Sequence, residues 1–219
     1  MVTIGMALAF QGKAQDVDRS QFCATDFYVK KSLEADPSRA LEVAQLEQFT
    51  KQFTQNLSAR KTTSGGAPLY IIPVVFHILH NYGPENISDA QIFDAVRVMN
   101  RDYRKLNPDT ANTVASFVNI AADAQIEFRL AQIDPNGNCT NGIDRIVTTK
   151  TVLADDGAKL NPWANNKYLN IWVARSLANS GAAAYAYLPG TASNNVDGVL
   201  ALYSYVGSIG QSSDLNSRA

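Results

Sequence analysis

The sequence predicts one main α/β domain in which a mixed, twisted sheet is backed by helices. Two observations lead to this fold class. From residue 69 onward, apolar runs rich in β-branched residues alternate with amphipathic stretches and clusters of turn-forming residues. The chain also has 219 residues, 46% of them hydrophobic, which is enough to bury one sizeable core and a small flanking segment.

The charge balance excludes partners that are attracted by a strong electric field. The chain has 19 Lys and Arg residues and 20 Asp and Glu residues, so its net charge is close to zero. No long-range attraction for nucleic acids or anionic lipids results, and we expect no nucleic-acid partner. No segment approaches the roughly 18 apolar residues of a membrane span, so none is expected.

Residues 1–15 are interpreted as the remnant of a secretory signal. The apolar run at residues 2–10 is too short to span a bilayer, and small and polar residues follow it at 11–15. The basic start of a signal is absent, so either the start codon is misplaced or the chain is a fragment at this end. The alternative is a frayed N-terminus. The first interpretation predicts a secreted, extracellular protein.

Residues 16–66 are expected to form a helical leading segment and a linker, ahead of the main domain at 67–219. Asp36-Pro37 is a helix start signal. Apolar residues then recur on one face of the helix, which needs a partner surface: Leu46, Phe49, Phe53 and Leu57. Residues 58–68 break every periodicity, and an exposed basic linker of this kind is a natural site of proteolytic processing.

The first elements of the main domain have the clearest signals. Residues 69–79 form an almost continuous apolar run, typical of a central strand that is covered on both faces. After a turn, Ser88 can cap a helix, Gln91 completes a capping box, and Ile87 with Ile92 forms a hydrophobic staple. The buried face of this helix is expected to carry Ile92, Val96, Met99 and Tyr103.

The later elements are predicted from weaker patterns. A second helical stretch is expected near 115–124, followed by a strand at 126–133 and a turn-rich segment at 134–142. Further strands are expected at 143–148, 168–174, 182–188 and 196–205. No closing helix or strand is predicted after residue 208.

The residues that could carry chemistry give no complete catalytic motif. The two histidines, His77 and His80, are three positions apart in a strand, so they face opposite sides of the sheet and are interpreted as structural. The zinc signature H-E-x-x-H, a nucleophile elbow and the phosphate-binding glycine motifs are all absent. Asp155 and Asp156 are expected to lie in a solvated loop rather than in a calcium or acid/base site.

Four stretches, in this order, resemble the pappalysin family of zinc metalloendopeptidases, which are relatives of the metzincins. They are residues 70–80 (YIIPVVFHILH) with 83–92 (GPENISDAQI), 106–110 (LNPDT), 126–131 (IEFRLA) with 134–143 (DPNGNCTNGI), and 184–190 (AYAYLPG) leading to 197–199 (DGV). The resemblance implies that the main domain is the upper subdomain of a zincin-like catalytic domain.

The resemblance also implies what the chain lacks. In the family, a helix with H-E-x-x-H-x-x-G-x-x-H follows shortly after the stretch that resembles residues 203–207, and this chain ends at about that point. No catalytic or metal-ligating residue can therefore be assigned here. Zinc is expected in the intact protein, with ligands beyond this chain, and the chain alone is expected to be inactive. Nothing indicates whether calcium is needed.

Two features can be carried over from the family. The strand at 182–187 resembles the upper rim of the cleft, an edge strand that pairs with an extended peptide, so Ala183, Ala184, Tyr185 and Ala186 are predicted to bind substrate. An ordinary edge strand is the alternative. Residues 22–26 (FCATD) resemble the start of some precursors, in which a Cys23 thiolate on zinc would hold the enzyme latent. A disulfide between Cys23 and Cys139 is the alternative.

The sequence therefore predicts the front part of a secreted zinc metalloendopeptidase, an enzyme class that hydrolyses peptide bonds with a metal-activated water. Its expected partner is a protein or peptide substrate. The alternative hypothesis is a secreted, non-enzymatic binding module that uses an open sheet edge for protein contacts.

Overall fold

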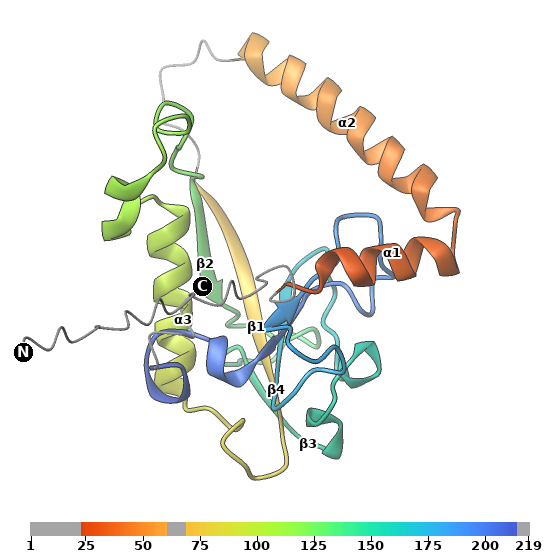
Figure 1. The fold of residues 1–219 in the computed structure, drawn as a ribbon, viewed down its shortest axis with the longest axis vertical. Helices are drawn as coiled ribbons and strands as arrows, with labels where there is room; N and C mark the ends of the chain where they lie inside the picture. Colours follow the sequence, from red (N-terminus) through yellow and green to blue (C-terminus); the bar gives the residue numbers. More distant parts are fainter. Residues whose placement is uncertain (1–22, 61–68, 214–219) are drawn as a thin grey trace, which may run out of the picture.

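The computed structural model describes residues 23–60 and 69–213, which contain a six-stranded mixed sheet (Figure 1). The strand order is β2-β1-β4-β6-β5, and β3 also pairs with β1. All neighbours are parallel except β5 and β6. The strands are β1 (Tyr70–His80), β2 (Ile126–Leu130), β3 (Ile143–Val147), β4 (Leu169–Ala174), β5 (Ala184–Tyr185) and β6 (Val199–Leu202).

Strand β1 is the centre of the sheet, as its apolar run predicts. Its first half pairs with β2, its second half pairs with β3, and its other edge pairs with β4 over residues 74–78. Residues 74–80 are all buried. The mixed sheet backed by helices confirms the predicted fold class.

Helix α3 (Asp89–Tyr103) covers one face of the sheet and begins where the capping signal predicts. The Ser88 hydroxyl accepts a hydrogen bond from the Gln91 backbone N–H at 3.2 Å, and the staple residues Ile87 and Ile92 are both buried. The predicted capping box is wrong in one respect. The Gln91 side chain does not return to Ser88 but donates to the carbonyls of Tyr203 and Val206, at 3.1 and 3.0 Å.

Two hydrophobic clusters lie on the two faces of the sheet. The α3 side contains Val74, Phe76, Ile78, Ile171 and Val173 from the strands, together with Ile92 and Ala95 from the helix. The opposite side contains Leu79, Trp172 and Leu200 from the strands, with Ala24 and Tyr28 from the leading segment. The leading segment therefore contributes to a core of the main domain.

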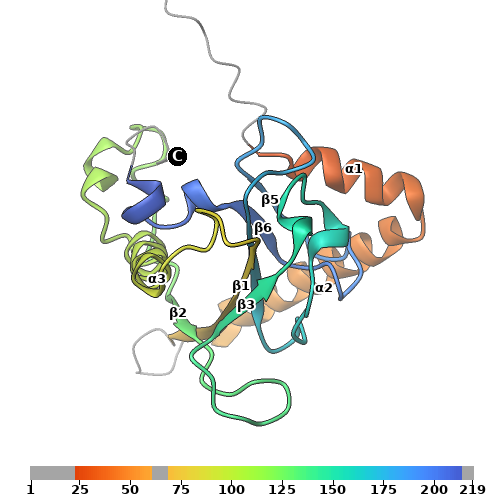
Figure 2. The same ribbon diagram turned by 90° about the horizontal axis from the view of Figure 1, so that it is seen from below.

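The leading segment forms two helices rather than one, α1 (Thr25–Ala35) and α2 (Arg39–Arg60), which Asp36-Pro37 separates. Figures 1 and 2 show α1 beside the β5 end of the sheet. Along α2, Leu46, Phe49 and Phe53 remain 39%, 61% and 48% exposed. The partner surface expected for this apolar face is thus not provided by residues 23–60 and 69–213.

The weaker sequence patterns were partly wrong. Residues 115–120 form turns instead of a helix, and their apolar side chains Phe117, Val118 and Ile120 are exposed. A short helix without a surface to pack on is marginal in water, which explains the difference. The strands expected at 182–188 and 196–205 shrink to β5 and β6, and the latter gives way to a 3₁₀ turn at Tyr203–Tyr205.

Gly198 sets the start of β6. Its φ is +132°, and a Cβ there would lie 2.5 Å from the Asn170 carbonyl oxygen of β4, so only glycine allows this close approach.

The signal-like residues 1–15 and the linker residues 61–66 lie outside the described part of the chain. Within residues 23–60 and 69–213, no helix combines the length and apolar character needed to cross a membrane.

Candidate functional site at the sheet edge

Strand β5 is the end strand of the sheet, as predicted for residues 182–187. Its inner edge pairs antiparallel with β6, with Ala184 opposite Ala201 and Tyr185 opposite Leu200. The Ala183 carbonyl also faces β6, because it accepts from the Leu202 N–H at 2.9 Å. Successive residues of a strand turn their backbone groups to opposite edges, so those of Ala184 and Ala186 point outward, where a further strand could pair.

The leading segment occupies this outer edge. Cys23 forms a parallel bridge with Ala184, and the Ala24 N–H donates to the Ala184 carbonyl at 3.2 Å. The Ala186 N–H donates to the Thr25 hydroxyl, also at 3.2 Å. Two of the outward backbone groups that an added strand would use, the Ala184 carbonyl and the Ala186 N–H, are therefore engaged by the chain itself.

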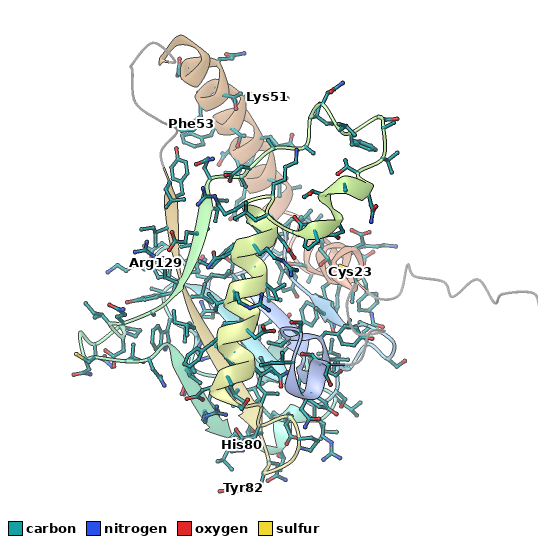
Figure 3. All side chains as sticks on the ribbon, turned by 90° about the vertical axis from the view of Figure 1, so that its left-hand side faces the viewer. Cys23, Lys51, Phe53, His80, Tyr82 and Arg129 are labelled. Atoms are coloured by element: carbon teal, nitrogen blue, oxygen red, sulfur yellow. The ribbon has the colours of Figure 1, made fainter. Side chains whose placement is uncertain are left out.

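The two cysteines are free and are not bonded to each other. Cys23 lies just before α1 (Figure 3), is exposed, and has its Sγ 3.3 Å from the Thr25 hydroxyl. Cys139 is exposed in the turn after β2, where it pairs with Ile133. The predicted disulfide alternative is not formed in this structure.

Tyr28 fixes α1 to the edge strand. Its ring stacks on that of Tyr185 with centroids 3.7 Å apart and planes at 12°, and the two residues are 4% and 1% exposed. The ring of Tyr187 meets both of them edge-on, at 6.3 and 6.1 Å. Farther along α1, the Ser32 hydroxyl donates to the Thr191 carbonyl.

Asp156 anchors the two β5-side tyrosines, which corrects the expectation of a solvated loop. Its carboxylate accepts from the hydroxyls of Tyr185, at 2.9 Å, and Tyr187. It also lies 3.1 Å from the ammonium group of Lys159. Only Asp155 matches the prediction, since it is exposed and caps the short 3₁₀ turn Asp156–Ala158. The sequence pattern missed Asp156 because its tyrosine partners lie about 30 residues away.

Lys159 is a buried cation beneath the tyrosine rings. Its Nζ lies 4.7 Å from the ring centroid of Tyr185 and 4.9 Å from that of Tyr187, and it donates to the Val196 carbonyl at 2.6 Å. Burial lowers the pKa of Lys159, and the charge of Asp156 opposes this effect. Burial, together with Asp156, raises the pKa of both Tyr185 and Tyr187.

The two histidines lie on opposite faces of β1, as their spacing predicts. His77 stacks on Trp172 at 5.0 Å, with its ring nitrogens 3.0 Å from Asp144 and 3.0 Å from Asn170. His80 is buried, and its Nδ1 accepts from the Tyr82 N–H at 3.4 Å. Over residues 23–60 and 69–213, no three His, Cys, Asp or Glu side chains are placed to hold a metal ion together. These residues do not fit a zinc site.

Neither a scan against protein-family models nor a search of curated proteins gives a match. Solved structures of mirolysin from Tannerella forsythia do match. Mature mirolysin in complex with a cleaved peptide is 41% identical with a TM-score of 0.61, over 66% of this chain and 57% of that chain. Mirolysin in complex with compound 9 gives the same values. A promirolysin mutant is 34% identical with a TM-score of 0.66, over 86% of this chain and 62% of that chain.

The chain is metalloprotease-like. It spans 57% to 62% of the lengths of these relatives. Promirolysin matches 86% of this chain, whereas mature mirolysin matches 66%. Promirolysin therefore resembles this chain over an additional stretch.

Proposed function

We propose that the chain is the leading part of a secreted zinc metalloendopeptidase of the pappalysin family, and that residues 23–28 hold the precursor latent by occupying the peptide-binding edge. The observation that carries this proposal is the pairing of Cys23 and Ala24 with Ala184 of β5, and of Thr25 with Ala186 just after it. A segment that uses the outward backbone groups of an edge strand prevents an extended peptide from using them.

Substrate binding is assigned to β5 on the same grounds. Ala184 and Ala186 supply the outward carbonyl and N–H groups, and Tyr185 supplies a ring face beside them. Ala183 directs its carbonyl to β6 and therefore supports the strand from within. Mature mirolysin, a similar protein, has been solved with a cleaved peptide bound.

The metal belongs to the intact protein in this proposal. Because residues 23–60 and 69–213 offer no set of ligands, zinc would take its ligands from elsewhere in the protein, and no step of hydrolysis is assigned to the residues described here.

Cys23 is proposed as the latency thiol. It is exposed, it is not bonded to Cys139, and it lies against the outer side of β5, where an extended substrate would run. A thiolate is a good zinc ligand, and a docked segment would hold it at a high effective concentration near the metal.

The alternative, a binding module with an open sheet edge, finds less support. The β5 edge is already covered by the leading segment.

The proposal is tested with the full-length protein and a quenched fluorescent peptide library. We expect little hydrolysis before processing, a large increase after cleavage in the linker near Arg60, loss of activity with a zinc chelator and recovery with added zinc. The Cys23→Ala precursor should be active before processing, or should become active much faster during processing. A processed protein that binds no zinc and hydrolyses no peptide would contradict the assignment.

A further inference from the structure

The side chain of Tyr28 fills a site that is built without it. Tyr28 is the one buried residue of α1, whereas its neighbour Phe27 is 55% exposed. The groups around Tyr28 are also bonded to one another, without a contribution from α1. Asp156 accepts from the Tyr185 and Tyr187 hydroxyls and pairs with Lys159, which also donates to Val196. Withdrawal of α1 would therefore expose a preformed aromatic surface, which we name the tyrosine seat (Tyr185, Tyr187, Asp156 and Lys159).

The tyrosine seat lies within reach of a peptide on β5. Tyr185 belongs to β5, and its two neighbours Ala184 and Ala186 present the outward backbone groups. The leading segment shows that one chain can pair with the edge and reach the seat at the same time. It bonds to the Ala184 carbonyl and the Ala186 N–H, and the ring of Tyr28, three residues after Thr25, stacks on Tyr185. Main-chain pairing at a sheet edge combined with a side-chain pocket is a recurring mode of peptide recognition.

The chemistry of the seat favours an aromatic side chain. Once α1 has left, the ring face of Tyr185 that Tyr28 covers becomes the contact surface for a ligand. A planar aromatic ring buries more area on this face than a branched aliphatic side chain does, and it also gains stacking energy. A cationic side chain gains little, because the Lys159 ammonium group and the Asp156 carboxylate are paired with each other and the cation would have to leave water. The carboxylate of Asp156 is already paired with Lys159 and both hydroxyls, so it offers little to a basic group.

We propose that the tyrosine seat is a specificity subsite for an aromatic side chain of a peptide that pairs with β5, and that Tyr28 occupies this subsite in the precursor. This inference rests on the proposed function, since it names the kind of peptide that the edge prefers.

Binding to the 219-residue chain tests the inference without any cleavage. The probes are capped alanine-based pentapeptides that differ only at a central Tyr, Leu or Lys, with affinity followed by NMR shifts of the Ala184 and Ala186 amides. The Tyr28→Ala chain should bind the Tyr peptide roughly 2- to 10-fold more tightly than the Leu peptide. The Lys peptide should bind most weakly. Three chains keep a ring at position 28 and serve as controls: the wild type, Phe27→Ala and Tyr28→Phe. Their affinity for each of the three peptides should be at least about tenfold lower than the affinity of the Tyr28→Ala chain for the Tyr peptide.

Tyr28→Leu is the second variant, which retains an apolar side chain in case Tyr28→Ala does not fold, and it should also admit the Tyr peptide. Equal affinities for the Tyr and Leu peptides, or equal binding by the wild-type and Tyr28→Leu chains, would overturn the subsite. Because no hydrolysis is measured, aromatic selectivity in this assay would stand even if the full-length protein proved to have no peptidase activity, which would refute the proposed function alone.

Discussion

The ring of Tyr28 lies face to face with that of Tyr185, 3.7 Å away, and this stack joins the leading segment to the edge strand of the sheet. Backbone hydrogen bonds alone would give a short parallel pairing at Ala184. The stack adds a buried aromatic contact that continues into the Asp156 and Lys159 pair. Docking of the leading segment therefore depends on side chains that are far apart in the sequence.

Truncation of Tyr28 should release α1. Tyr28→Ala removes a ring that is almost fully buried, which should weaken docking by about 3 kcal/mol. Hydrogen exchange at the Ala24 and Ala186 amides should accelerate, and limited proteolysis should cut within α1. The matched variant Phe27→Ala removes a largely exposed ring that meets Tyr28 only edge-on, so it should change both measurements much less. Unchanged protection at both amides in Tyr28→Ala would contradict this account of docking.

Removal of the Asp156 carboxylate should destabilise the fold strongly. Asp156→Ala leaves the buried Lys159 ammonium group without its counter-ion and the Tyr185 hydroxyl without its acceptor, and we expect a loss of about 3 kcal/mol in the free energy of unfolding. Asp155→Ala is the adjacent control, which loses one cap of a short turn and should cost about 1 kcal/mol. Urea unfolding of both variants makes the comparison. Equal costs would mean that the buried pair is not important for stability.

Gly198 should not tolerate alanine. A Cβ at this position would lie 2.5 Å from the Asn170 carbonyl oxygen and 2.8 Å from the Trp172 ring, so Gly198→Ala should cost about 3 kcal/mol or more. Gly137→Ala provides the control, because Gly137 also has a positive φ, +88°, but has open space around it. That variant should lose only about 1 kcal/mol from backbone strain. A thermal melt of each variant distinguishes steric overlap from strain.

Stability should fall above about pH 10, because folding raises the pKa values of three clustered tyrosines. Burial first, and then Asp156 through its charge or its hydrogen bond, raises the pKa values of Tyr28, Tyr185 and Tyr187 above their ordinary value of 10.0. The unfolded tyrosines release their protons first, so the stabilisation is complete below pH 10 and is lost as pH rises toward the folded pKa values. The lowered pKa of Lys159 acts in the opposite direction, but on a single group.

Urea midpoints between pH 8 and pH 11 check this dependence. Tyr28→Phe removes one of the three hydroxyls and should flatten the decline, whereas Phe27→Leu should leave it unchanged. A midpoint that stays constant or rises over this range would be inconsistent with buried, un-ionised tyrosines.

The central part of the fold follows from local sequence signals. The apolar run of β1 and the cap at Ser88 act within a few residues, so pattern alone locates the central strand and the start of α3. The same pattern predicts the wrong partner for the Gln91 side chain, because its acceptors, the carbonyls of Tyr203 and Val206, are more than 100 residues away in the sequence. The sequence pattern could not supply those partners.

The candidate site was predictable only in outline. The resemblance to a protease family located the edge strand, but the pairing of Cys23 with Ala184 and of Tyr28 with Tyr185 brings together residues about 160 positions apart. Asp156 looked like part of a polar loop because its neighbours in sequence are polar, while its partners Tyr185 and Tyr187 belong to the edge strand and the residues after it. Such clusters depend on tertiary packing.

The central claim is that the leading segment and a peptide substrate compete for β5, and inhibition in trans tests it most directly. A synthetic peptide of residues 22–35 is added to the processed full-length protein during hydrolysis of a fluorogenic peptide. We predict competitive inhibition, with a peptide carrying Tyr28→Ala at least about tenfold weaker and one carrying Phe27→Ala affected much less. Absence of inhibition, or inhibition that raised substrate does not relieve, would contradict the account.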